Sequence, residues 1–194
     1  MQNTGDSTGS ANPDGARSQL LELLRTLSYR RGTVTLASGK TSDFFIDCKQ
    51  TVLTAEGHAL VGELMLAAIA DEKFDAVACV ELGGCPLASA VALTSALRKS
   101  PLDAIYVRKE AKDHGSQKLV EGGTRLAKGA RIALLEDVVT TGGSTLKAAE
   151  KLAQSGFVVA RVVALVDRLE GGRQAIESAG FAFASLYSKT DFLA

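Results

Sequence analysis

Short apolar runs alternate with helix-length segments along the chain, and this alternation limits the fold more than any other feature. The runs that we interpret as strands cover residues 76–80, 104–107, 132–139, 158–166 and 181–186. The segments with helical character cover residues 17–28, 54–70, 87–98, 146–155 and 172–179. Strands that alternate with helices favour a parallel sheet with right-handed crossovers. We therefore predict an α/β fold, in which a doubly wound parallel sheet is flanked by helices.

The length and composition fit one domain preceded by a polar tail. A chain of 194 residues with 46% hydrophobic residues can bury a substantial core. Residues 1–16 are rich in Ser, Asn, Gly and Asp, a composition typical of disordered segments. We therefore predict a disordered tail over residues 1–16 and a single domain over residues 17–194.

Charge, hydropathy and cysteine content disfavour several classes of function. Lys+Arg and Asp+Glu both number 22, so no overall positive charge attracts nucleic acid or an anionic membrane. The apolar runs fall short of the roughly 20 residues that a membrane-spanning helix needs. Cys48, Cys79 and Cys85 are odd in number and lack C-x-x-C spacing, which argues against a disulfide framework or a zinc site. We expect a cytoplasmic protein without nucleic-acid or membrane partners.

The run over residues 132–139 leads into a segment that could bind a sugar phosphate. Glu136 and Asp137 lie near its end, and the loop that follows reads Thr140-Thr141-Gly142-Gly143-Ser144-Thr145. The next helix would present free backbone N–H groups at this loop, where they favour a phosphate. The glycines allow close approach, and two adjacent carboxylates can accept hydrogen bonds from neighbouring sugar hydroxyls. The segment alone also fits an ordinary strand–turn–helix connection.

A second polar segment follows the run over residues 104–107. It reads Arg108-Lys109-Glu110-Ala111-Lys112-Asp113-His114-Gly115 and contains four groups that can be cationic. Such a stretch is often only a solvated surface loop. Here it follows a predicted parallel strand, at the edge where open α/β sheets bind ligands. Together, the two segments predict a site for a phosphorylated sugar with mobile cations beside it.

Both segments resemble those of the type I phosphoribosyltransferases. The stretch from Glu136 to Thr145 is similar to the family's phosphoribosyl pyrophosphate motif, and the pattern Arg-Lys-x-x-Lys-x-His-Gly resembles the orotate branch. The resemblance extends from about Leu20 to Arg168. It implies a type I phosphoribosyltransferase-like parallel sheet with a small N-terminal hood, the hood over residues 17–53 and the core over residues 54–194.

This resemblance also implies an activity. The 5-phosphoribosyl group of phosphoribosyl pyrophosphate would be transferred to N1 of orotate, giving orotidine 5′-monophosphate and pyrophosphate in pyrimidine biosynthesis. Mg²⁺ would be the cofactor, with no metal held tightly by the protein alone. The active unit would be a homodimer with shared active sites, because in this family the cationic loop reaches the neighbouring subunit.

By the same resemblance, individual residues receive roles. The catalytic residues would be Lys112, His114 and Asp137. Phosphoribosyl pyrophosphate would be bound by Arg108, Lys109, Lys112, His114, Glu136, Asp137, Val138, Val139, Thr140, Thr141, Gly142, Gly143 and Ser144. Orotate would be bound by Phe44, Phe45, Thr140 and Arg168. The planar guanidinium of Arg168 suits a carboxylate, although a charge at a strand end is often only solvated.

Two positions depart from the family pattern, and they keep two alternatives open. Ala37 and Gly83 stand where well-known bacterial members carry lysines, and Lys40 and Lys49 are candidates to replace the missing charge. One alternative is a phosphoribosyltransferase for another base, which the charged loop and Arg168 disfavour. The other is a non-catalytic regulator that senses phosphoribosyl pyrophosphate, which the neutral net charge disfavours.

Overall fold

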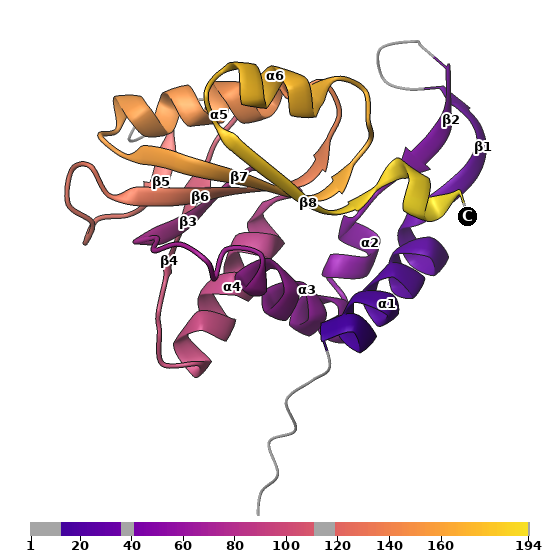
Figure 1. Ribbon diagram of the computed structural model, residues 1–194, viewed down its shortest axis with the longest axis horizontal. Coiled ribbons are helices and arrows are strands. Elements are labelled where there is room, and N and C mark those ends of the chain that lie inside the picture. Colours follow the sequence, from indigo (N-terminus) through magenta and orange to yellow (C-terminus); the bar gives the residue numbers. More distant parts are fainter. Residues whose placement is uncertain (1–12, 36–40, 111–118, 194) are drawn as a thin grey trace, which may run out of the picture.

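A mostly parallel sheet forms the centre of the molecule (Figure 1). The computed structural model describes residues 13–35, 41–110 and 119–193, and in this part of the chain the order of the main sheet is β5-β4-β3-β6-β7-β8. The parallel strands are β3 (Ala76–Val80), β4 (Asp103–Val107), β6 (Arg131–Val139), β7 (Val158–Asp167) and β8 (Ala182–Ser188). The predicted α/β sheet is confirmed. The edge strand β5 (Val120–Gly122) is antiparallel to β4 and lies outside the predicted strands, because its three residues are too few to show a pattern.

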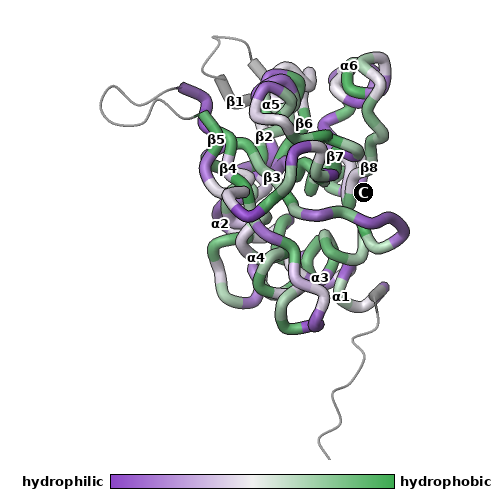
Figure 2. The backbone as a smooth tube through the Cα atoms, turned by 90° about the vertical axis from the view of Figure 1, so that its left-hand side faces the viewer, coloured by the Kyte–Doolittle hydropathy of each residue, from purple (hydrophilic) through white to green (hydrophobic). Residues whose placement is uncertain are grey.

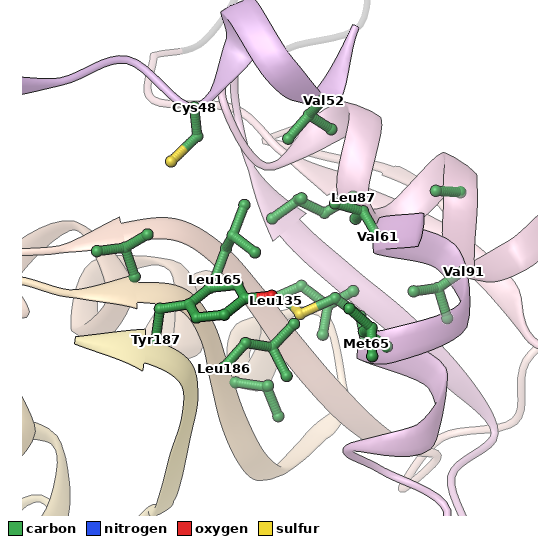
Figure 3. Close-up of a cluster of buried hydrophobic side chains, with 14 of the residues drawn as sticks. Cys48, Val52, Val61, Met65, Leu87, Val91, Leu135, Leu165, Leu186 and Tyr187 are labelled. Atoms are coloured by element: carbon green, nitrogen blue, oxygen red, sulfur yellow. The ribbon is translucent and has the colours of Figure 1, made fainter. Parts of the chain in front are cut away.

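Helices cover both faces of the sheet (Figure 1). On one face lie α3 (Ala55–Ala67) and α4 (Cys85–Leu97), and on the other lie α5 (Gly143–Gln154) and α6 (Gly172–Ser178). Successive strand residues point to opposite faces, so one strand contributes to two cores. In β6, Leu135 packs in the cluster that contains Met65 of α3 (Figure 3), whereas Leu134 packs on the α5 side.

The central strands are buried on both faces, as their continuous apolar runs predict. Every residue of β3 is buried, and β6 is buried from Ile132 to Glu136. Figure 2 shows hydrophobic residues concentrated along the strands, with hydrophilic residues more frequent in the connecting loops. Among the described residues, no helix is long and apolar enough to cross a membrane.

The N-terminal part forms a smaller unit at one end of the sheet (Figure 1). It consists of α1 (Pro13–Leu23), a π-helical turn (Leu24–Ser28), the antiparallel pair β1 (Tyr29–Thr35) and β2 (Thr41–Ile46), and α2 (Lys49–Val52). The ring of Phe44 is fully buried, with its centroid 5.2 Å from that of Tyr29 and 5.7 Å from that of Phe192. Phe192 belongs to the 3-10 helix η2 (Lys189–Phe192), so the β1–β2 pair packs against this helix.

One difference from the prediction is that helix α1 begins at Pro13, within the segment 1–16 predicted as a disordered tail. Proline suits the first turn of a helix.

Some of the predicted features fall outside the described residues. Residues 1–12, the rest of the predicted tail, are not described. The same is true of Ala37 and Lys40, and of the stretch 111–118 that contains Lys112 and His114.

Candidate active site

The carboxyl ends of the parallel strands meet at one edge of the sheet, where polar loops follow each strand. A cleft of about 280 Å³ lies at this edge. Its lining includes Lys49, Gly83, Lys109, Glu136, Asp137 and Ser144. The two segments that the sequence singled out, together with the loop after β3, therefore lie around one cavity.

Glu136 lies at the bottom of this site, and its side chain is held by the loop that follows β6. It is 3% exposed. Its Oε1 accepts hydrogen bonds from Ser144 Oγ at 2.9 Å and from Thr145 Oγ1 at 3.1 Å. Burial, together with the neighbouring charge of Asp137, raises the pKa of Glu136 to about 7. The buried carboxyl thus holds the start of α5 through two hydroxyl groups.

Asp137 lies closer to the opening of the cleft, and the loop after β3 passes directly beside it. Burial raises the pKa of its carboxyl, whereas the backbone of Val138 and the charge of Lys49 act in the opposite direction. A Cβ atom at position 83 would collide with the Asp137 carboxylate. Any larger residue at position 83 would therefore have to displace the Asp137 carboxylate.

Lys49, at the start of α2, supplies a cation to the cleft. Its Nζ lies 2.5 Å from Asp47 Oδ1, and this hydrogen bond raises the pKa of Lys49. Of the two lysines considered as replacements for the missing charge, Lys49 therefore lines the site, whereas Lys40 lies outside the described residues.

The predicted phosphate loop connects β6 to α5. Gly142 has φ +79° at the N-cap of α5, a left-handed conformation that glycine adopts without strain. Thr141, Gly143 and Ser144 are exposed, whereas Val139 is buried, and Val138 and Thr140 are partly buried. Gly143 and Ser144, in the first turn of α5, are therefore exposed where a ligand could reach their backbone N–H groups.

The charged loop over residues 108–115 begins at Arg108 and Lys109, and these two residues are held by contacts that the sequence pattern does not indicate. Lys109 N–H donates to Glu81 Oε1 at 2.6 Å. On α5, Lys151 Nζ donates to the carbonyl oxygens of Arg108 and Lys109, both at 2.8 Å. Glu81 and Lys151 lie far from these partners in the sequence, so local spacing cannot pair them. The available signal is that Lys151 shares a helix face with Ser144, seven residues earlier.

Two of the residues expected to bind the base, Arg168 and Phe44, lie together beside the phosphate loop. Arg168 follows β7, is 8% exposed, and donates its backbone N–H to Val139 O at 2.9 Å. Its guanidinium lies 5.6 Å from the centroid of the Phe44 ring, and Lys189 Nζ lies at the same distance. Phe45 is partly buried and pairs in register with Arg30. Arg168 and Phe44 are thus in contact, with Arg168 next to the phosphate loop.

Acidic side chains could approach a cation in the cleft, but they do not enclose it. In the ranges 13–35, 41–110 and 119–193, no group of three or more His, Cys, Asp or Glu residues is placed to hold a metal ion. Glu136 and Asp137 are the carboxylates that line the cleft together with Glu81. A metal at this site would take its remaining oxygen ligands from water or from a bound ligand.

The family model and the most similar relatives that we compared all belong to the phosphoribosyltransferases. Residues 51–185 match the model of the phosphoribosyl transferase domain. The chain is 61% identical, over 91% of its length and 93% of the relative's length, to orotate phosphoribosyltransferase of Sorangium cellulosum (strain So ce56). It is 45% identical to that of Rhodopseudomonas palustris (strain TIE-1), over 92% of this chain and 96% of the relative.

Solved structures give the same result. The fold is similar to that of Mycobacterium tuberculosis H37Rv orotate phosphoribosyltransferase in complex with 5-phospho-α-D-ribosyl 1-diphosphate, with a TM-score of 0.77 and 33% identity. That match covers 92% of this chain and 99% of the other. Adenine phosphoribosyltransferase of Thermoanaerobacter pseudethanolicus shares the fold at a TM-score of 0.65 and 19% identity, over 87% of this chain and 99% of the other.

Proposed function

Because the chain belongs to the orotate phosphoribosyltransferases of the phosphoribosyltransferase family, we propose that it transfers the 5-phosphoribosyl group from phosphoribosyl pyrophosphate to N1 of orotate. The products are orotidine 5′-monophosphate, an intermediate of pyrimidine biosynthesis, and pyrophosphate. The observation that carries the proposal is a single cleft that joins a carboxylate pair, Glu136 and Asp137, to the start of α5. Arg168 lies on the other side of the same loop.

The donor would lie along the loop between β6 and α5. The 5-phosphate would accept hydrogen bonds from the exposed backbone N–H groups of Thr141, Gly143 and Ser144 and from the Thr141 hydroxyl. Asp137 would accept hydrogen bonds from the ribose hydroxyls, because its carboxylate faces the cleft beside Gly83. The deeper Glu136 would keep the loop in shape through Ser144 and Thr145.

Orotate would bind between the phosphate loop and the hood. Arg168 carries the positive charge that a carboxylate requires. Its backbone N–H is bonded to Val139, and Thr140 is the next residue of the loop. Phe44 lies beside the guanidinium, and the backbone at Phe44 and Phe45 would contact the base. The carboxylate distinguishes orotate from uracil, so this end of the site would determine the choice of base.

The reaction breaks the bond between ribose C1 and pyrophosphate and forms a bond between C1 and orotate N1, whose proton passes to water without a protein base. Positive charge develops on the ribose ring and negative charge on the leaving pyrophosphate. Arg108, Lys109 and Lys49 would stabilise the leaving group, with Lys112 and His114 supplying further charge and a proton. Preorganised charges of this kind stabilise the transition state more effectively than water does.

We also propose Mg²⁺ as the cofactor, which the site fits. Glu136 and Asp137 are adjacent carboxylates whose pKa values are raised by burial, and a cation beside them would favour their charged forms. Both would hold the ion together with oxygen atoms of the donor. When bound, Mg²⁺ supplies positive charge that offsets the charge of pyrophosphate.

A homodimer with shared active sites is proposed for the same reaction. Large hydrophobic side chains are exposed on α4 and on the loops beside it, and one of them, Leu82, lines the cleft. Their exposed fractions are 68% for Leu53, 69% for Leu82, 58% for Leu93 and 75% for Leu97. A surface of this kind favours association with a second copy. Lys112 and His114 of one subunit would then serve the site of the other, while Lys109 lines the cleft of its own chain.

We propose the cytoplasm as the compartment. Cys48, Cys79 and Cys85 are all free thiols in the structure. Free thiols persist in a reducing compartment, whereas oxidising compartments favour disulfides. The substrates of the proposed reaction are small anions, so no nucleic-acid or membrane partner is required.

Product identification tests the choice of base. The full chain would be incubated with phosphoribosyl pyrophosphate, Mg²⁺ and equal amounts of orotate, uracil, adenine and hypoxanthine, and the nucleotides identified by mass spectrometry. We expect orotidine 5′-monophosphate to be the main product. Uridine or purine nucleotides as the main products would favour the alternative of another base. Donor binding without any nucleotide product would favour the alternative of a regulator.

A further inference from the structure

One buried charge next to the site has no role in the proposed chemistry. Asp167 is the last residue of β7 and is 1% exposed. It lies in register with Val139 of β6 and Ser188 of β8, between two other strands. Burying a carboxylate is unfavourable unless hydrogen bonds and opposite charges compensate. The partners of Asp167 therefore indicate what the buried charge does.

One oxygen of Asp167 binds the turn that follows the strand, and the other lies beside the helix after that turn. Oδ1 accepts a hydrogen bond from Leu169 N–H at 2.9 Å. Oδ2 makes no hydrogen bond in the described part of the chain, but lies 3.5 Å from Nε of Arg173, at the start of α6. Arg173 in turn lies 4.6 Å from the centroid of the Phe183 ring. The carboxylate thus ties the beginning of the turn to the helix at its end.

The turn has an unfavourable backbone conformation at its centre. Leu169 has φ +58°, in the left-handed region that residues other than glycine disfavour. Its side chain is 54% exposed, so burial of the leucine does not explain the conformation. The hydrogen bond from its N–H to Asp167 forms an Asx turn, which compensates locally for the strain.

Arg168 lies inside this turn, between the buried carboxylate and the strained residue. Its backbone N–H is bonded to Val139, and its guanidinium lies 2.6 Å from the carboxylate of Glu170. The direction of the guanidinium therefore depends on the backbone angles that Asp167 stabilises. A change in these angles would move the guanidinium relative to Phe44 and the phosphate loop.

We propose that Asp167 is a positioning residue, which holds the turn so that Arg168 can bind the carboxylate of the base. The inference deepens the proposed function and rests on it. Loss of the Asp167 carboxylate should weaken recognition of ligands with a carboxylate on the base. Binding of phosphoribosyl pyrophosphate should change much less, because the donor contacts lie on the β6–α5 loop.

The test compares two variants with the wild type. For Asp167→Ala we expect the orotate KM to rise about tenfold or more and the donor KM to stay within about twofold. Asp167→Asn keeps an oxygen acceptor for Leu169, so its orotate KM should rise less, by about threefold. Calorimetry should show weaker binding of orotidine 5′-monophosphate. Binding of uridine 5′-monophosphate, which lacks only the carboxylate, should be unchanged.

Two further variants separate positioning from a general effect on stability. Glycine adopts positive φ freely, so adding Leu169→Gly to Asp167→Ala should relieve the backbone strain. The orotate KM of the double variant should be about threefold lower than that of Asp167→Ala alone. Asp75→Ala removes a similar carboxylate–amide hydrogen bond, from Arg131 N–H at 2.7 Å, at the opposite edge of the sheet. It should leave both KM values unchanged.

Each outcome decides the inference. An unchanged orotate KM in folded Asp167→Ala, or an equal loss for both substrates, would overturn it. If Asp167→Ala does not fold, Asp167→Asn decides: a selective rise in the orotate KM supports the inference, and an unchanged KM overturns it. A wild type that does not turn over orotate would instead overturn the proposed function, and this inference with it.

Discussion

At the scale of single residues, Glu136 links the shape of the site to pH. Its folded-state pKa of about 7 lies above the ordinary value of 4.5, because the carboxyl is buried beside Asp137. The folded protein therefore keeps a proton that the unfolded chain loses as pH rises between these two values. The stability of the ligand-free protein should fall across this window, and bound cations should oppose the fall.

Glu136→Gln tests this dependence. The raised pKa corresponds to a loss of about 3 kcal/mol in the free energy of unfolding between pH 4 and pH 8. The amide keeps an oxygen acceptor for Ser144 and Thr145 but cannot ionise, so most of this loss should disappear in the variant. Urea denaturation of both proteins at several pH values measures the difference. Parallel curves of stability against pH would contradict the raised pKa.

Gly83 is required for a steric reason, and Gly83→Ala tests it. The added methyl group would collide with the Asp137 carboxylate, so we expect a loss of about 1–3 kcal/mol in the free energy of unfolding and a higher donor KM. Asp137→Ala removes the colliding atoms. In that background the same substitution should cost little stability. An equal cost in both backgrounds would show that the collision is not the cause.

At the scale of elements, α5 has two functions in the site. Its first turn faces the phosphate position, and Lys151 near its other end holds the root of the charged loop through two carbonyl oxygens. Lys147 lies one turn earlier on the same helix, and together with Lys151 it lines a second cavity beside Arg108 and Lys109. A single helix thereby sets the distance between the phosphate loop and the cations.

Lys151→Ala should loosen this arrangement, and Lys147→Ala is its matched control. Loss of two charge-assisted hydrogen bonds, partly exposed to solvent, should raise the donor KM by about threefold to tenfold. Lys151→Arg can still donate to a carbonyl and should restore part of the affinity. Steady-state kinetics with varied donor gives the comparison. The account of the helix fails if Lys147→Ala has the larger effect.

The same elements show what could be predicted from sequence. Strands β3 and β6 could be predicted from the sequence, because burial on both faces gives each of them a continuous run of apolar residues. Glu136, Asp137 and the loop after them form one contiguous segment, so their chemistry was visible. The contacts of Glu81, Lys151 and Asp167 depend on residues brought together by the sheet, and no local spacing records them. Strand β5 and the hairpin of β1 and β2 are too short or too polar to show a period.

At the scale of the whole molecule, the proposed dimer makes the active site a property of two chains. Lys112→Ala removes a proposed cation of the charged loop, and Asp137→Ala removes the carboxylate of the cleft. If sites are shared, a mixture of the two inactive variants should regain activity through hybrid dimers, up to about a quarter of the wild-type rate at random mixing.

Subunit exchange must be verified for this test, for example by mass spectrometry of the mixed species. A mixture that exchanges subunits but stays at background activity would contradict shared sites. A protein that is monomeric at the concentration of the assay and fully active would contradict the dimer itself. In that case, the exposed leucines on and beside α4 would need another explanation.

The most direct test of the central claim is the loss of orotate ultraviolet absorbance in the presence of phosphoribosyl pyrophosphate and Mg²⁺. The account predicts a decrease that requires both the donor and the metal. It also predicts that Asp137→Asn reduces the rate by about a hundredfold or more without lowering the melting temperature, since burial already disfavours the charged carboxyl. A constant absorbance with folded wild-type protein, or an undiminished rate in Asp137→Asn, would contradict it.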